Sequence, residues 1–103
     1  MNPETYFQLD RVIHERSRLA LVSLLAASEP LSFTDLRDTL GMSDGNLTTH
    51  LRTLEEAGYL TVARHAGETR RHTDFRLSPA GRTAFEAYLQ QLEQIVRENR
   101  PPR

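Results

Sequence analysis

The sequence contains no cysteine, no lysine and no tryptophan among its 103 residues. Without cysteine the chain has no disulfide framework and no thiol chemistry, which favours a reducing, cytoplasmic location. No apolar run approaches the roughly 18 residues that a membrane-spanning helix needs, and the first residues lack the basic and apolar stretches of a signal peptide. We therefore expect a cytoplasmic protein with no membrane partner.

The charges of the chain nearly cancel, because it contains 13 arginines and 14 acidic residues, which gives a net charge of −1. This balance excludes a polycation that coats nucleic acid, although it leaves room for a locally basic surface. The length suits one small domain, and 38% hydrophobic with 26% charged residues is a globular composition. Any positive patch must therefore be made by the fold.

The spacing of apolar residues predicts three helices, a β-hairpin and a long last helix. The first helical region is either one helix or two with a joint near His14. Ser32, Ser43 and Ser78 stand where helix N-caps are expected, and Gly41 suits the left-handed residue that closes a helix. The expected single domain, 1–103, divides into a first helix region at 9–28, a helix-turn-helix at 32–58, a β-hairpin wing at 59–77 and a C-terminal dimerisation helix at 79–99.

Five stretches carry a resemblance to a known family, and they occur in order at residues 18–22, 41–51, 54–60, 73–82 and 85–88. In these stretches the chain resembles the small stand-alone winged helix-turn-helix DNA-binding domains, relatives of the MarR-like and ArsR-like transcriptional regulators. The resemblance runs from about residue 9 to residue 96. It implies a mainly helical fold with a β-hairpin wing, an intracellular homodimer, and double-stranded DNA as the partner.

The second helix of the predicted helix-turn-helix is the candidate recognition helix, at 43–57. On a helical wheel Leu47, Leu51 and Leu54 share the core face, so the opposite face points toward the major groove. Arg52 can pair with guanine, and Asn46 can pair with adenine. The predicted DNA-binding residues of this helix are Ser43, Gly45, Asn46, Thr48, Thr49, Arg52 and Thr53. Two acidic residues, Asp44 and Glu56, lie near the same groove and would repel phosphates.

The wing, at 64–73, offers further basic side chains. Arg64, Arg70 and Arg71 are predicted to contact the DNA backbone or the minor groove. The alternative is a solvated hairpin tip whose charges make no contact.

An apolar stripe along the last helix is too long for the core of so small a domain. Two protomers that pair this stripe with the N-terminal apolar residues would bury both sets. The predicted interface residues are Tyr6, Phe7, Leu9, Tyr88, Leu89, Leu92, Ile95 and Val96. The alternative is a last helix that folds back on its own core. A small-molecule effector is compatible with such a dimer, and its natural site is the cleft between the dimer helices and the DNA-binding body.

The remaining chemistry-bearing residues suggest neither an enzyme nor a cofactor protein. The four histidines have no His-x₃₋₅-His pair and no cysteine beside them, so the sequence predicts no metal site within one chain. The predicted function is a dimeric, sequence-specific transcriptional regulator, a repressor that binds a palindromic operator. The alternative is a winged-helix protein-interaction module without DNA binding, because residues 43–72 carry no net charge.

Overall fold

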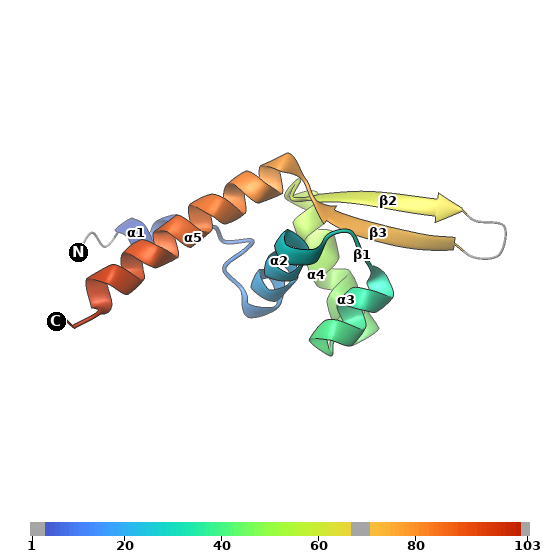
Figure 1. Cartoon of the computed structure of the whole chain (residues 1–103), viewed down its shortest axis with the longest axis horizontal. Helices are drawn as coiled ribbons and strands as arrows, with labels where there is room; N and C mark the ends of the chain where they lie inside the picture. Colours follow the sequence, from blue (N-terminus) through green and yellow to red (C-terminus); the bar gives the residue numbers. More distant parts are fainter. Residues whose placement is uncertain (1–3, 67–70, 102–103) are drawn as a thin grey trace.

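The computed structural model describes residues 4–66 and 71–101. They form a mainly helical fold with a small antiparallel sheet, as the sequence predicts (Figure 1). The elements in chain order are α1 (Glu4–Gln8), α2 (Arg16–Ser28), β1 (Leu31–Ser32), α3 (Phe33–Leu40), α4 (Asp44–Glu56), β2 (Leu60–Ala66), β3 (Arg71–Leu77) and α5 (Pro79–Asn99).

The N-terminal region contains two helices, as one of the two alternatives predicts, but the break between them spans residues 9–15 and is not confined to the vicinity of His14. The prediction of helix from residue 9 onward is wrong, because residues 9–15 form turns between α1 and α2. The Asp10 carboxylate accepts hydrogen bonds from the N–H groups of Val12 (2.8 Å) and Ile13 (3.0 Å). A side chain that captures nearby backbone donors in this way competes with the helical pattern. The turn carries Ile13 into the core, where it is fully buried.

Local capping defines the ends of the two helices of the helix-turn-helix. Ser32 and Asp35 form a reciprocal capping box at the start of α3, and Gly41 closes that helix with φ of 65°. Ser43 then caps α4, since its hydroxyl oxygen accepts a hydrogen bond from the N–H of Asn46 (3.1 Å). A second left-handed glycine, Gly58, follows α4 with φ of 81°.

The sheet has the order β1-β3-β2, with both pairs antiparallel. The two-residue strand β1, which pairs Leu31 with Phe75, was not predicted because it is too short to show an alternating pattern. In the hairpin, alternation separates two faces. Val62 and Phe75 pair on the face that packs against the helices, and His65 pairs with His72 on the outer face.

The core is one cluster that draws on α2, α3, α4, α5, the sheet and the turn before α2. Tyr88 of α5 is fully buried, and its hydroxyl lies 2.7 Å from Nδ1 of His14. Leu9 is also buried, at 8% exposure. The helix α5 is therefore anchored through its first half, and the turn at residues 9–15 packs against it.

The molecule is elongated, with extents of 60 × 25 × 22 Å. Figure 1 shows why: α5 and the β2–β3 hairpin project in opposite directions from a body made by α2, α3 and α4, and α1 lies beside the outer half of α5. No helix in the described part of the chain is long and apolar enough to cross a membrane.

The junction between the hairpin and α5 is tightly built. The N–H of Ser78 donates to the carbonyl oxygen of Tyr59 (2.9 Å), and the Ser78 hydroxyl donates to the carbonyl oxygen of Gly58 (2.6 Å). At Gly81, in the first turn of α5, a Cβ atom would lie only 2.3 Å from the same Tyr59 oxygen. The helix can start in this position only because residue 81 has no side chain.

A carboxylate at the end of α2 also holds this junction. Glu29 accepts hydrogen bonds from the N–H of Leu77 (2.8 Å) and from the guanidinium of Arg82. Although desolvation acts in the opposite direction, these two hydrogen bonds hold the pKa of the Glu29 carboxyl below its ordinary value. The end of β3 and the start of α5 are thereby tied to α2.

The hydroxyl of Tyr59 donates to the Asp10 carboxylate and links the turn at residues 9–15 to the start of the hairpin. This hydrogen bond, together with burial and the negative charge of Asp10, raises the pKa of Tyr59 from 10.0 to about 12. The folded state therefore favours the neutral phenol. The resulting stability is complete below pH 10 and is lost as the pH rises from about 10 to about 12.

We expect Tyr59→Phe to lower the free energy of unfolding at pH 7 by about 1–2 kcal/mol, because a hydrogen bond to a partly solvated carboxylate is lost. The difference from the wild type should shrink as the pH rises above 10. Urea unfolding at pH 7 and pH 11 measures both effects. The control is Tyr6→Phe, which removes a hydroxyl that is 3.5 Å from Nδ2 of Asn99, at a position that is 39% exposed. An undiminished difference at pH 11 would contradict the role of this pair.

Candidate nucleic-acid interface

The helix α4 has two faces, and they are those that the sequence predicts. Leu47, Leu51 and Leu54 are buried in the core. Of the predicted DNA-binding residues of this helix, one, Thr53, is half-buried. The others are exposed, and they are Ser43, Gly45, Asn46, Thr48, Thr49 and Arg52. One side of α4 therefore belongs to the core, and the exposed side is the one available to a ligand.

The N-terminal end of α4 is suited to an anion. The dipole of a helix and its unpaired N–H groups make this end positive. Ser43 uses its hydroxyl oxygen as an acceptor for the cap, so the hydroxyl proton can still be donated to a phosphate. Gly45 has open space around the position of a Cβ atom, so a bound molecule could approach its backbone closely.

Two threonines of α4, the exposed Thr49 and the half-buried Thr53, use their hydroxyls within the helix. The Thr49 hydroxyl donates to the carbonyl of Gly45 (3.0 Å), and the Thr53 hydroxyl donates to the carbonyl of Thr49 (3.1 Å). Their protons are therefore engaged, and these side chains offer a methyl group and an acceptor oxygen instead. Such a methyl group suits contact with the methyl group of thymine.

The acidic residue at the start of α4 is compensated by an arginine that the sequence analysis did not single out. Nη1 of Arg37, on α3, lies 3.2 Å from Oδ1 of Asp44, and its Nε lies 3.1 Å from Oδ1 of Asp38. Hydrogen bonds to Asp38 and Asp44 raise the pKa of Arg37, so the guanidinium stays charged. The repulsion expected between Asp44 and a phosphate is reduced by this pairing, which only the packing of α3 against α4 creates.

A cleft of about 350 Å³ separates α4 from the inner face of the sheet. Arg52 and Thr48 line it from α4, and Arg64 lines it from β2. The full lining is Phe33, Thr48, Leu51, Arg52, Glu55, Val62, Arg64, Thr73 and Phe75. The structure thus brings a predicted recognition residue and a predicted wing residue to one surface. Glu55 at the same cleft was missed, because on the wheel it falls between the core face and the exposed face.

Only part of the predicted wing contact can be placed. Arg64 is exposed and stands opposite Thr73 in the hairpin register. Arg71 begins β3 opposite Ala66. The side chain of Arg71 and the whole of Arg70 lie outside the described residues.

Residues 17–96 match the family described as the winged helix DNA-binding domain. The protein belongs to this family. The predicted fold and family are therefore confirmed.

The winged helix is also similar to individual proteins. It is 29% identical over 85 residues to the uncharacterized protein MJ0432 of Methanocaldococcus jannaschii, covering 82% of this chain and 92% of that protein. It is 31% identical over 83 residues to the uncharacterized HTH-type transcriptional regulator YdgJ of Bacillus subtilis, covering 81% of this chain but only half of that protein. A solved structure of a transcriptional regulator homologue from Pyrococcus horikoshii superposes with a TM-score of 0.86 at 20% identity, over 92% of this chain and 96% of that one.

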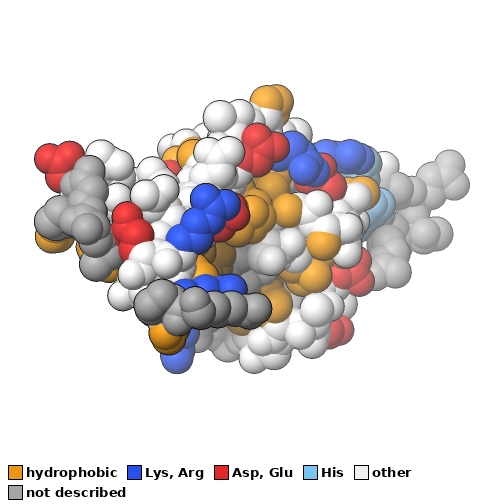
Figure 2. Space-filling view, turned by 60° about the vertical axis from the view of Figure 1, so that its left-hand side comes forward, with side chains coloured by type: hydrophobic (Ala, Val, Ile, Leu, Met, Phe, Trp, Pro, Cys, Tyr) orange, Lys and Arg blue, Asp and Glu red, His pale blue; other side chains and the backbone are white. Residues whose placement is uncertain are grey.

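Away from the cleft between α4 and the sheet, apolar side chains of α1 and α5 reach the surface. Phe7 is 86% exposed and Leu89 is 46% exposed, and Tyr6 and Val96 are exposed as well. On the face shown in Figure 2, charged side chains of both signs are interspersed with apolar ones. The predicted interface residues Leu92 and Ile95 are half-buried and pack against the core.

Two predicted interface residues need a correction, because they are buried within the protomer. Tyr88 is 1% exposed and Leu9 is 8% exposed, so neither presents surface to a partner. Tyr88 packs into the core near the middle of α5, where its hydroxyl lies 2.7 Å from Nδ1 of His14. Leu9 enters the core because the turn at residues 9–15 redirects the chain. Both residues stabilise the protomer instead.

Proposed function

We propose that this winged helix protein is a dimeric, sequence-specific DNA-binding transcriptional regulator that acts as a repressor on a palindromic operator. The observation that carries the proposal is the cleft that is lined both by Arg52 of α4 and by Arg64 of β2. Two guanidinium groups on separate elements can contact a base edge and a phosphate at the same time.

In this proposal the recognition helix, at 43–57, enters the major groove and the wing, at 64–73, lies on the backbone or in the minor groove. Arg52 pairs with guanine through two hydrogen bonds, and Asn46 pairs with adenine. The methyl groups of Thr49 and Thr53 favour thymine. Ser43, at the positive end of α4, contacts a phosphate.

The overall charge of −1 does not oppose this proposal. Binding would depend on the few arginines at the interface, and the ion pair between Arg37 and Asp44 removes part of the repulsion at the start of α4. A protein that neutralises few phosphates has a shallow dependence of affinity on salt. We therefore expect salt to weaken binding moderately.

The exposed apolar side chains of α1 and α5 support the dimer. The helix α1 and the outer half of α5 lie at the end of the molecule opposite the wing (Figure 1). A partner that covers Phe7 and Leu89 would remove apolar surface from water, which stabilises the complex by about 25 cal/mol per Å² before the costs of association. A two-fold dimer formed here would present two copies of α4 to half-sites about 34 Å apart.

We expect the double variant Phe7→Glu, Leu89→Glu to be a folded monomer, because two charges would stand at the centre of the proposed interface. Sedimentation velocity measures the oligomeric state. The matched control is Gln90→Glu, which adds a charge at an exposed position of the same helix. A double variant that sediments as the wild type does would place the dimer contact elsewhere or exclude a dimer.

The direct test is a fluorescence-anisotropy titration against duplex fragments from around the protein's own gene. It is carried out at two salt concentrations with random DNA as competitor. Binding that survives the competitor and weakens with salt supports a sequence-specific regulator, and transcription in vitro from the bound fragment should then fall. No binding at either salt concentration would contradict the proposal and favour a protein-interaction module.

A further inference from the structure

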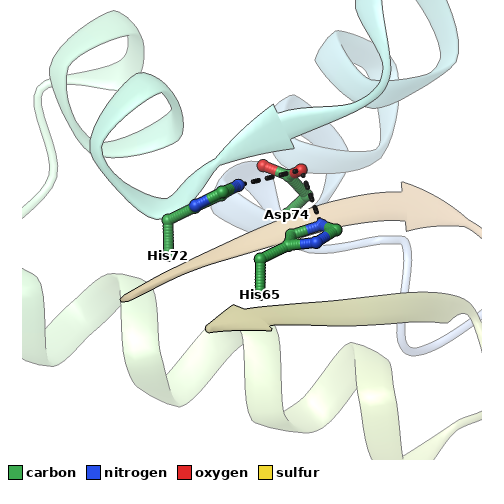
Figure 3. A group of neighbouring side chains, drawn as sticks. All are labelled: His65, His72 and Asp74. Atoms are coloured by element: carbon green, nitrogen blue, oxygen red, sulfur yellow. Dashed lines mark ion pairs between the residues drawn. The ribbon is translucent and has the colours of Figure 1, made fainter. Parts of the chain in front are cut away.

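Three side chains converge on the outer face of the wing, on the side away from the cleft with Arg52. His65 and His72 stand directly opposite each other in the β2–β3 register, and Asp74 lies two residues along β3 on the same face. Figure 3 shows both imidazole rings directed at the Asp74 carboxylate, one from each strand. The cluster depends on strand pairing, so the spacing rules applied to the sequence could not find it.

The distances between the ligand atoms are close to those of a metal site. Nε2 of His65 lies 3.2 Å from Oδ2 of Asp74, and Nε2 of His72 lies 3.7 Å from the same oxygen. One ligand atom from each of the three residues falls within 4.8 Å of the others. In a tetrahedral zinc site with bonds of about 2.0–2.1 Å, the ligand atoms are about 3.3–3.4 Å apart. Small side-chain rotations would therefore bring the three atoms onto one ion.

We propose that His65, His72 and Asp74 form a binding site for a divalent transition-metal ion of the zinc type. Two imidazole nitrogens and one carboxylate oxygen are the ligands that Zn²⁺, Ni²⁺ and Cu²⁺ accept, whereas Mg²⁺ and Ca²⁺ prefer oxygen alone. Three protein ligands leave a fourth position for water. This site is independent of the proposed regulation of transcription.

The surroundings permit an ion to enter and to be held. The side chains of His65 and His72 are 48% and 47% exposed, whereas that of Asp74 is 26% exposed and lies further from the tip. The two rings stack with centroids 4.5 Å apart, so they already lie side by side on the outer face of the hairpin. Preorganised ligands lose less conformational entropy on binding.

A bound ion would join β2 to β3 through side chains, close to the end of the described hairpin. The bonds from the ion to His65 and His72 would there supplement the hydrogen bonds between the strands. We expect this link to slow the opening of the wing. Hydrogen exchange of the amides in 60–66 and 71–77 should therefore slow with Zn²⁺, and exchange in α5 should not change.

The experiment is a calorimetric titration of Zn²⁺ into the untagged full chain, with Mg²⁺ as the comparison ion. We expect one Zn²⁺ per chain and no binding of Mg²⁺. His65→Gln, His72→Gln and Asp74→Asn should each weaken Zn²⁺ affinity at least about 10-fold, since even the loss of an outer partner of a metal ligand has that effect. Because the two histidines are exposed, these variants should remain folded, and circular dichroism checks that they do.

The matched control is His50→Gln, which removes a histidine of α4 beside Arg18. It should bind Zn²⁺ as the wild type does. In NMR spectra the ring signals of His65 and His72 should shift with Zn²⁺, and those of His14 should not. No saturable Zn²⁺ binding, or equal affinity in the wild type and the His65 and His72 variants, would overturn the proposed site.

Discussion

The Arg52→Ala variant should bind the operator about 10-fold to 100-fold more weakly than the wild type does. Its affinity for random DNA should remain nearly that of the wild type. A bidentate contact between arginine and guanine contributes about 1–3 kcal/mol of discrimination against other bases. Arg52 is exposed on α4 and lines the cleft with Arg64. Competitive anisotropy titrations with the operator and with variants at each base pair measure the loss and locate the base that Arg52 contacts.

Two further variants control for charge. Arg64→Ala should lower the affinity for operator DNA and for random DNA by about the same factor. It should also reduce the slope of log affinity against log salt concentration by about 1, as expected for the loss of a phosphate contact. Arg97→Ala removes the same charge from α5, where the guanidinium pairs with Glu93 at 2.6 Å, and should change neither affinity. An equal loss on operator and random DNA for Arg52→Ala would show that Arg52 contacts the backbone and reads no base.

Gly81→Ala should lower the free energy of unfolding by about 3 kcal/mol, near the upper end of what overpacking costs. The added Cβ atom would lie 2.3 Å from the Tyr59 carbonyl oxygen, which also accepts a hydrogen bond from the N–H of Ser78. That oxygen belongs to the backbone, so relief requires α5 to move away from the start of β2. Urea unfolding of the variant and the wild type gives the difference.

Gly45→Ala is the matched control, because it makes the same change in another helix. Nothing lies within 4 Å of the Cβ position at Gly45, and its φ is not positive. Alanine favours helix over glycine by up to about 1 kcal/mol, so this variant should be as stable as the wild type or more so. If both variants lose the same stability, the contact with Tyr59 is not the cause. In the proposed DNA complex, Gly45→Ala should also weaken binding, because it blocks close approach of the backbone.

The parts of the fold that the sequence predicted well are those fixed by neighbouring residues. Ser43 caps α4 through an N–H three residues away, and Gly41 supplies a left-handed φ. Ser78 and Pro79 likewise start α5 at the predicted residue. Each of these signals acts within one turn of the chain, so the residue types alone contain it.

The parts that the sequence missed depend on residues that are distant along the chain. The turn at residues 9–15 resembles a helix in its apolar spacing. The Asp10 carboxylate, however, accepts hydrogen bonds from the N–H groups of Val12 and Ile13 and from the Tyr59 hydroxyl. The strand β1 exists only because β3 is beside it. Leu9 is buried only in the assembled core, where it joins a cluster drawn from distant parts of the chain.

The candidate site divides in the same way. The exposed face of α4 follows from the helical period, so the wheel identified Asn46 and Arg52 correctly as surface residues. The pairing of Asp44 with Arg37 and the position of Glu55 at the cleft follow from packing between elements. The meeting of His65 with His72 requires the register of the hairpin, which seven residues of sequence separation do not reveal.

The close contact at Gly81 also helps to set the direction in which α5 leaves the hairpin. The helix is about 30 Å long, and Tyr59, Ser78 and the ion pair between Glu29 and Arg82 hold its first turn in place. A change of about 10° in its direction would displace the far end by about 5 Å at that length. In a dimer joined through the outer half of α5, the distance between the two copies of α4 would therefore depend on this first turn, together with the packing of Phe85 and Tyr88 in the core. Substitutions in this first turn would change which operator spacing fits, although they touch neither the DNA nor the partner.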